Sequence, residues 1–378
     1  MTIRFGQIQS YRFGHYIKNV ELYLSEKKTN PNTSIDIFFL SSKSSNSYFE
    51  KMCKRKIKLY PFQILLTAFL IAKKIPFFKK NLINMRQYDI DKNNILDKVE
   101  CQISFTFDEK EQGDFLLNQL GINKKDKIIC IVSRDEEYAK KNLLGRYDLD
   151  NKWKVRNSDI QSYEHAAQKV SDLGYKVVRV GKDSEKNINF KNKNIIDYSK
   201  SKFRSDFLDI YLAYRCSFAV CDTAGWCNAP MAFRKYVAFV NWVPISELHY
   251  YSEKFTYISK HIYDLKQKKQ LSLNEIIERK LHSFLLQESK NAEIKFIDNT
   301  PEEIAALVLE VESKFRGSSK YKINDSQLNS DFKNFLIKNN FLENNMYSIA
   351  HKIDLHKNIK FKSTFGELFL GQNFNSRN

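Results

Sequence analysis

Short apolar segments alternate with amphipathic segments along most of this chain, and this alternation is the feature that most constrains its fold. Apolar segments at 2–8, 34–41 and 56–60 are interleaved with helix-like segments at 14–27 and from Pro61 onward. Apolar runs joined by helices are typical of parallel strands that are buried on both faces. The pattern weakens near residue 90, and residues 101–122 predict a connecting strand and helix.

A second and cleaner alternation begins at residue 127. Strands are predicted at 127–134, 175–181, 217–222 and 236–242, with helices at 158–174, 205–216 and 225–234. Ser158 is the expected N-cap of the first of these helices, and Gly174 is its expected stop. A late amphipathic helix at 300–317 has Thr300 as its cap and Pro301 in its first position.

The two alternations predict an α/β protein with two Rossmann-like domains that face a cleft. We expect a first domain at 1–120, a second at 121–300, and a C-terminal helix and tail at 301–378 that pack back on the domains. Ligands of open parallel sheets bind beyond the carboxyl ends of the strands. Residues that directly follow a predicted strand are therefore the candidates for a functional site.

The balance of charges restricts the partners of the chain. It has 62 Lys and Arg residues against 44 Asp and Glu residues, a formal net charge of +18. This excess favours an anionic partner such as a phosphorylated small molecule or an anionic lipid surface, although a generally Lys-rich composition also raises the charge. No recognisable nucleic-acid-binding motif occurs, so nucleic acid is not an expected partner.

The cysteines and the apolar runs bear on the cellular location. The six cysteines form no Cys-x-x-Cys pair, and Cys130, Cys216 and Cys221 lie in or beside predicted strands, where buried thiols are common. The N-terminus shows no apolar signal segment, and no run reaches the roughly 18 apolar residues that a spanning helix requires. The sequence therefore predicts a reduced, cytoplasmic protein.

Basic and polar residues follow several of the predicted strands. They are Arg12, Gly14 and His15 after the first strand, Arg134 and Lys182 after two later strands, Arg156 and Asn157 just before the helix at 158–174, and Asp222, Thr223, Ala224 and Gly225 at the start of a short helix. Helix N-termini, hydroxyl groups and arginine forks are the groups that bind phosphate. We therefore predict a diphosphate site at these strand ends.

Each residue of the segment 222–225 has an expected role. Gly225 would let a phosphate approach the backbone, Thr223 would donate its hydroxyl, and Asp222 would brace the loop or hold a sugar hydroxyl. The alternative is a simple turn, which is the more common role of a glycine after a strand. We expect neither a metal ion nor another cofactor, because basic side chains and the helix dipole can neutralise a leaving diphosphate.

His15 is the candidate proton acceptor. Imidazole titrates near neutral pH and can take a proton from an attacking hydroxyl group. The residue begins a helix of the first domain, which would face the phosphate site across the cleft; a buried structural histidine is the alternative. Glycosyl transfer needs such a base on one side and cations for the departing nucleoside diphosphate on the other.

Three motifs occur in a characteristic order: "RNSDI" at 156–160, "SDFLDIYLA" at 205–213, and "DTAG" at 222–225 followed by Pro230 and Phe233. As a set they resemble a family of bacterial glycosyltransferases found with surface-polysaccharide genes. The segments "RFGHYIKNVELYL" at 12–24, "TPEEIAALVLEV" at 300–311 and "FLGQNF" at 369–374 extend this resemblance over most of the chain. The family is similar in layout to GT-B glycosyltransferases.

The resemblance implies an acceptor-side domain at 1–120 and a nucleotide-sugar donor domain at 121–300. It implies a metal-independent transferase with a glycan or lipid-linked acceptor. The family often has Ser-Gly where this chain has Ala224-Gly225, so a hydroxyl donor to the phosphate is missing here. Two other functions stay open: a nucleotide-sugar epimerase on the same fold, and a non-catalytic nucleotide-sugar-binding module. An NAD oxidoreductase is disfavoured because no Gly-x-Gly-x-x-Gly follows a strand.

Basic clusters alternate with apolar residues in the segment 53–80. One interpretation is an interfacial helix whose lysines reach anionic headgroups of the inner membrane leaflet. Such a peripheral contact would suit a lipid-linked acceptor. The alternative is a core helix of the first domain that is flanked by solvated lysines.

Overall fold

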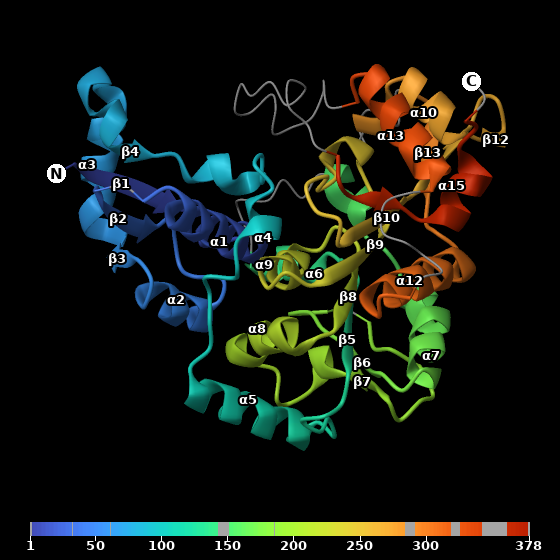
Figure 1. Ribbon diagram of the computed structural model, residues 1–378, viewed down its shortest axis with the longest axis horizontal. Helices are drawn as coiled ribbons and strands as arrows, with labels where there is room; N and C mark the ends of the chain where they lie inside the picture. Colours follow the sequence, from blue (N-terminus) through green and yellow to red (C-terminus); the bar gives the residue numbers. More distant parts are fainter. Residues whose placement is uncertain are drawn as a thin grey trace.

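The computed structural model describes residues 2–31, 33–60, 62–142, 151–184, 186–283, 292–318, 326–341 and 361–376. Two parallel sheets dominate the structure, one in each half of the chain (Figure 1). The N-terminal sheet has the strand order β3-β2-β1-β4, and the larger sheet has the order β14-β10-β9-β8-β5-β6-β7. All strand pairs in both sheets are parallel, so the α/β class with two Rossmann-like sheets is confirmed.

The N-terminal sheet and its helices come from the first 120 residues. The strands are β1 (Ile3–Ile8), β2 (Ile35–Leu40), β3 (Lys58–Tyr60) and β4 (Leu82–Ile83). The helices are α1 (Phe13–Thr29), α2 (Ser47–Lys54), α3 (Phe62–Lys74), α4 (Ile95–Lys98) and α5 (Phe107–Gln119), with the 3-10 helices η1 (Pro76–Asn81) and η2 (Met85–Asp89). Helix α5 follows that sheet in the chain but packs against α8 (Asp206–Arg215) of the larger sheet (Figure 1), and the predicted boundary at residue 120 comes directly after it.

The larger sheet begins with β5 (Ile128–Val132) and continues with β6 (Lys176–Arg179), β7 (Ile195–Asp197), β8 (Phe218–Cys221), β9 (Tyr236–Trp242) and β10 (Phe255–Ser259). Its helices include α6 (Glu137–Asn142), α7 (Glu164–Asp172), α8 (Asp206–Arg215) and α9 (Asn228–Ala232). Short 3-10 helices are η3 (Asn151–Arg156), η4 (Ile160–Tyr163), η5 (Tyr198–Lys200), η6 (Gly225–Cys227) and η7 (Ile245–Glu247).

The last third of the chain, from residue 261, packs on the larger sheet. A small antiparallel sheet joins β11 (His261–Asp264), β12 (Lys269–Gln270) and β13 (Ile294–Ile297), next to α10 (Leu273–Glu278) and η8 (Leu281–Ser283). Then follow α12 (Pro301–Phe315), α13 (Gln327–Lys338), β14 (Thr364–Phe365) and α15 (Glu367–Asn373). Strand β14 extends the sheet beside β10. Of the predicted tail, residues 319–325, 342–360 and 377–378 lie outside the described residues.

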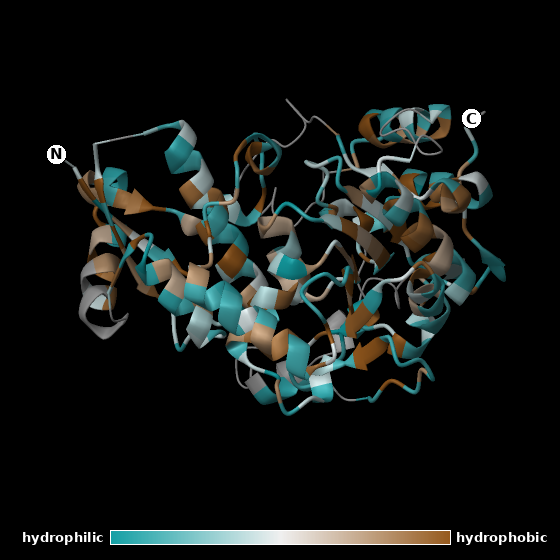
Figure 2. Cartoon of the chain, turned by 60° about the horizontal axis from the view of Figure 1, so that its bottom comes forward, coloured by the Kyte–Doolittle hydropathy of each residue, from teal (hydrophilic) through white to brown (hydrophobic). Residues whose placement is uncertain are grey.

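Burial follows the hydropathy pattern on which the predicted strands were based. Strands β5 and β8 are buried at every residue, because α7 and α12 cover one face of the sheet and α8 and α9 the other (Figure 1). In Figure 2 the strands of this sheet are brown, while the surrounding helices show teal outer faces. The buried side chains of both sheets belong to one continuous hydrophobic cluster, so the two halves share a core.

Two local predictions were wrong. Residues 101–106 form no strand; they connect α4 to α5 as an irregular segment. Ser158 does not cap a helix, because its hydroxyl donates to Asp222 Oδ2 instead, at 2.6 Å. The helix begins later, as the 3-10 turn η4 capped by Asp159, and continues as α7. Gly174 has the positive φ of 87° that a helix stop requires.

Helix α1 joins the two halves. It packs on the N-terminal sheet and also against α9 and η6 of the second half. The buried carboxylate of Glu21 accepts a hydrogen bond from Arg234 Nη2 at 2.7 Å, and it also accepts backbone N–H groups of residues 102 and 103. Farther along the interface, Asn46 Nδ2 donates to the backbone oxygen of Asp206 at 2.8 Å. These contacts fix how the two sheets face each other.

Helix α3 lies against β2, and its Leu70 and Ile71 side chains are exposed. Phe69 packs edge-on against Phe39, with 5.1 Å between the ring centroids. In the part of the chain that the structure describes, no helix is both long and apolar enough to cross a membrane.

Candidate functional site

A pocket opens where the strand order of the larger sheet reverses. The chain adds β6 and β7 on one side of β5 and then returns to place β8 on the other side. Loops diverge at such a switch point and leave a crevice at the carboxyl ends of the strands. The pocket encloses about 310 Å³ and is lined by residues that follow β5, β6 and β8, together with the N-terminus of α1 from the other half. This volume is in the range of small-molecule sites.

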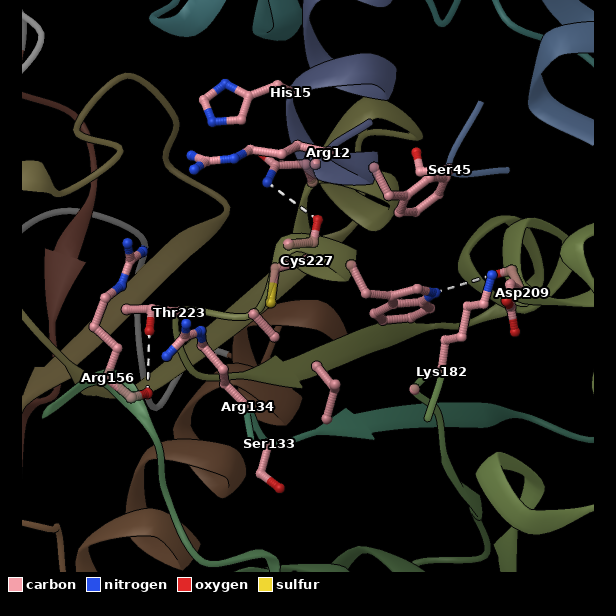
Figure 3. Close-up of a pocket in the computed structure, with 18 of the residues that line it drawn as sticks. Arg12, His15, Ser45, Ser133, Arg134, Arg156, Lys182, Asp209, Thr223 and Cys227 are labelled. Atoms are coloured by element: carbon pink, nitrogen blue, oxygen red, sulfur yellow. Dashed lines mark hydrogen bonds between the residues drawn. The ribbon is translucent and has the colours of Figure 1, made fainter. Parts of the chain in front are cut away.

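Most of the predicted site residues lie in this pocket. Its lining includes Arg12, Gly14, His15, Arg134, Arg156, Lys182, Thr223, Ala224 and Gly225. Figure 3 shows the side chains of Arg12, Arg134 and Arg156 extending from different elements toward one region, with His15 above them. Asn157 and Asp222 do not belong to the lining and stand behind it. Six Lys or Arg and three Asp or Glu side chains line the pocket, so its net charge suits an anion.

Asp222 organises the loop that follows β8. Its buried carboxylate accepts hydrogen bonds from the backbone N–H of Arg134 at 2.6 Å, from Ser158 Oγ at 2.6 Å and from the backbone N–H of Ala224 at 2.9 Å. Burial raises the pKa of this carboxyl, and these hydrogen bonds oppose the shift. Of the two roles expected for Asp222, its bonds fit the brace: it joins the loops after β5 and β8.

Arg134 is held from behind by Asn157. Arg134 Nη1 donates to Asn157 Oδ1 at 2.7 Å, and the backbone oxygen of Asn157 accepts from Lys260 Nζ at 2.7 Å. Thr223 Oγ1 donates to the backbone oxygen of Arg156 at 3.3 Å. These bonds tie the three loops together, so the arginine side chains enter the pocket from a braced backbone.

The start of α1 faces the loop after β8 across the cleft. No side chain among the described residues caps this helix, and its first turn holds no acidic residue. Its positive end therefore adds to the charge of the pocket. Gly14 lies so close to the opposite loop that a methyl group at this position would stand 2.7 Å from both the Gly225 oxygen and Asn228 Nδ2. Packing between the two halves therefore requires a glycine at position 14.

His15 is paired with a carboxylate that the sequence analysis did not identify. Its Nδ1 lies 2.7 Å from Asp89 Oδ1, at the end of η2. The pKa of Asp89 is lowered by this pairing against the opposing effect of burial, so Asp89 is a carboxylate and Nδ1 carries the proton. The lone pair then sits on Nε2. Burial lowers the pKa of His15, and Asp89 opposes this shift, so the imidazole is neutral at physiological pH.

Lys18, Glu247 and His249 also line the pocket and were missed. Burial lowers the pKa of Lys18 and of His249 and raises that of Glu247. Two signals in the sequence could have revealed them. Lys18 is three residues after His15 and so shares its helix face. Glu247 and His249 follow the strand predicted at 236–242, and so they also lie beyond the carboxyl end of a strand.

Asp209 and Trp226 form another missed part of the lining. Trp226 Nε1 donates to the backbone oxygen of Asp209 at 3.0 Å. Burial raises the pKa of the Asp209 carboxyl to about 6. Helix α8 turns this residue toward the pocket.

Two Rossmann-like parallel sheets that share a cationic cleft constitute a GT-B-like α/β fold, as the sequence predicted. Solved structures of this kind are similar to the chain. ADP-heptose lps heptosyltransferase II of E. coli is 13% identical to this chain. The match covers 82% of this chain and 100% of the heptosyltransferase chain, with a TM-score of 0.46. A family 9 glycosyl transferase from Veillonella parvula DSM 2008 is 11% identical, covers 82% and 97%, and has a TM-score of 0.47.

A second E. coli heptosyltransferase, solved with ADP-2-deoxy-2-fluoro heptose, is 7% identical over 68% of this chain and 93% of its own, with a TM-score of 0.33. No protein-family model and no curated protein matches the chain. All three similar structures are named as glycosyl- or heptosyltransferases.

Alanine substitutions at Gly14 and Gly225, which face each other, are expected to distinguish residues needed for packing between the two halves from residues needed for ligand binding. Gly14→Ala should lower the free energy of unfolding by about 1–3 kcal/mol, the usual cost of overpacking, because its methyl group meets backbone. Gly225→Ala should fold normally, since the nearest atom to its methyl group is 3.5 Å away, yet it should weaken nucleotide binding if a phosphate approaches this backbone. Thermal unfolding and nucleotide titration of each variant measure the two effects.

Gly371→Ala is the matched control, because α15 leaves open space around this glycine. It should stabilise the protein slightly by favouring the helix. Normal stability of Gly14→Ala would show that the two halves can move apart at little cost. Unchanged nucleotide affinity of Gly225→Ala would remove the backbone at 225 from the phosphate site.

Proposed function

We propose that this chain is a glycosyltransferase that moves a sugar from a nucleoside-diphosphate sugar to a hydroxyl group of its acceptor. One observation carries the proposal: a single pocket brings together a carboxylate-paired histidine from one half and a braced set of cations from the other. Glycosyl transfer needs a base for the acceptor hydroxyl and cations for the departing nucleoside diphosphate.

The cationic side would bind the donor and stabilise the leaving group. Arg134 and Lys182 follow strands of the larger sheet, Arg156 ends η3, and Arg12 stands opposite them at the start of α1. As the bond from the anomeric carbon to the diphosphate breaks, its electron pair passes to the diphosphate oxygen. Pre-positioned cations stabilise that developing charge without reorganising.

The histidine side would activate the acceptor. His15 Nε2 takes the proton of the acceptor hydroxyl while the oxygen attacks the anomeric carbon. Asp89 holds the ring through Nδ1 and stabilises the imidazolium that forms. The pair remains competent at neutral pH because burial keeps the imidazole unprotonated before the reaction.

The acceptor and the setting follow from the sequence motifs. Their resemblance to transferases found with surface-polysaccharide genes suggests a glycan or lipid-linked acceptor in bacterial envelope synthesis. All six cysteines are free thiols, which suits the reducing cytoplasm where such a reaction would take place.

Nucleotide binding followed by turnover tests the proposal. Calorimetric titration with UDP, GDP, ADP, dTDP and CMP should identify one preferred nucleotide. Sugar donors of that nucleotide should then release free nucleotide as a glycan acceptor gains mass. Binding without release would instead indicate a binding module, and an isomerised donor without release would indicate an epimerase.

Arg134→Ala is expected to weaken binding of the preferred nucleotide by about 1.5–3 kcal/mol, the range for hydrogen bonds to charged groups. The backbone at 134 stays bonded to Asp222, so the loop should keep its shape. Arg316→Ala is the control, because Arg316 is half exposed and pairs with Glu312 on α12; it should leave affinity unchanged. Equal affinities of the two folded variants would exclude Arg134 from the donor site.

A further inference from the structure

Apolar side chains are exposed at the outer end of the N-terminal half, where α3 leads into η1. Leu70, Ile71, Ile75, Phe77 and Phe78 all lie on the surface, with Ile71 56% and Phe77 70% exposed. We call these residues, with Lys73, Lys74, Lys79 and Lys80, the α3–η1 tip. Exposed apolar residues are common singly, but a contiguous group usually marks an interaction surface.

The sequence around the tip is basic. Residues 51–88 contain ten Lys and Arg residues and no Asp or Glu. At the average acid content of the chain, about four Asp or Glu would occur in a segment of this length. A generally Lys-rich composition accounts for the lysines but not for the missing acids. Three of the ten, Lys51, Lys54 and Arg55, pair with Glu50 or Glu109, so the positive field at the tip comes mainly from its own four lysines.

The position of the tip leaves its exposed face available to a partner. Phe69, on α3, packs against Phe39 of β2 and anchors the helix to the sheet. Figure 1 shows α3 on the side of the N-terminal half that is turned away from the C-terminal half. The tip therefore belongs neither to the pocket nor to the interface between the halves.

We propose that the α3–η1 tip docks on the surface of an anionic lipid bilayer. Apolar side chains such as Phe77 would enter the boundary between headgroups and acyl chains, while the flanking lysines contact anionic headgroups. A second copy of the chain fits less well, because two tips of the same charge repel each other. The membrane surface is thus the partner that satisfies both the apolar and the basic residues. The proposal stands independently of the proposed catalytic activity.

Co-sedimentation with vesicles tests this surface. The protein should sediment with vesicles of phosphatidylcholine and 30% phosphatidylglycerol at low salt, and it should be released at high salt as the attraction is screened. The double variant Lys79→Gln/Lys80→Gln should reduce partitioning by about 25-fold, from about fivefold per lysine. Phe77→Ser should reduce it by roughly tenfold, since an inserted aromatic side chain is lost.

The exposed phenylalanines of α5 provide the matched control. Phe107 and Phe115 are 73% and 64% exposed, but Asp108, Glu109, Glu111 and Asp114 stand among them. Phe107→Ser/Phe115→Ser should leave vesicle binding unchanged. The proposal is overturned if the native protein stays in the supernatant at low salt, if the tip variants bind vesicles normally, or if the α5 variant loses binding equally. Dimerisation that the tip variants abolish would assign the surface to a second copy instead.

Discussion

His15→Ala is expected to lower turnover by about 10²–10⁴-fold, the usual contribution of a general base, with little change in nucleotide affinity. His15 lines the pocket on the side opposite the loops after β5 and β8, so the binding cations remain in place. Steady-state kinetics and nucleotide titration on the same preparation separate the two effects. His165→Ala is the control, since this histidine is exposed on α7.

The pH profile should identify Asp89 as the residue that positions His15. The base acts in its neutral form, so the rate should fall at acid pH as His15 becomes protonated. Its pKa lies below the usual value because of burial, so this fall should come below the ordinary histidine range. Asp89 raises that pKa, and Asp89→Asn should therefore move the fall to still lower pH while also reducing the plateau rate.

A merely structural role of Asp89 would reduce the rate without moving the profile. If His15→Ala keeps near-normal turnover, the histidine does not act as the base, and the paired carboxylate loses its assigned role as well. If His15→Ala keeps near-normal turnover but shifts the pH profile, another group in the pocket is the base and His15 only alters the pKa of that group.

Asp222→Ala is expected to have the largest effect on stability, a loss of at least about 3 kcal/mol. Each of three part-buried donors would lose its acceptor, at about 1–3 kcal/mol for each unsatisfied group. These donors are the N–H groups of Arg134 and Ala224 and the hydroxyl of Ser158. Thermal unfolding measures the loss, and nucleotide binding should fall further than in Arg134→Ala, because two loops are released together.

Asp172→Ala is the control for this substitution, because Asp172 is exposed at the end of α7. It should change the free energy of unfolding by less than about 0.5 kcal/mol, as surface substitutions usually do. A stable Asp222→Ala protein that still binds nucleotide normally would show that the loops keep their shape without this brace.

Most of the fold could be predicted from the sequence because buried parallel strands are continuously apolar. The apolar runs of β5 and β8 clearly predicted strands. Arg134 and the segment 222–225 were identified as candidates because they follow the ends of these strands. Local sequence patterns predicted the caps of helices less well than they predicted strands. Ser158 has the side chain of an N-cap, yet a buried carboxylate 64 residues away takes its hydrogen bond, and no local rule predicts that choice.

Asp89 could not be found from the sequence for a similar reason. It ends the short 3-10 helix η2 between β4 and α4, which is too short for a periodicity that assigns residues to a face. Its place beside His15 depends on how η2 packs against α1, across 74 residues of chain. The exposure of the α3–η1 tip also depends on tertiary packing, because an apolar helix beside a sheet has the same sequence pattern whether its outer face is covered or not.

The sharing of α1 between the two halves has a consequence for how the chain folds during synthesis. The N-terminal half leaves the ribosome first, yet the buried Glu21 meets Arg234 only 213 residues later. Until α9 and Arg234 emerge, one side of α1 stays uncovered and an acidic group lacks its counter-ion. Contacts so distant in sequence delay folding and prolong the exposure of apolar surface. The nascent chain should therefore depend most on chaperones after its first half has been synthesised and before α9 and Arg234 emerge.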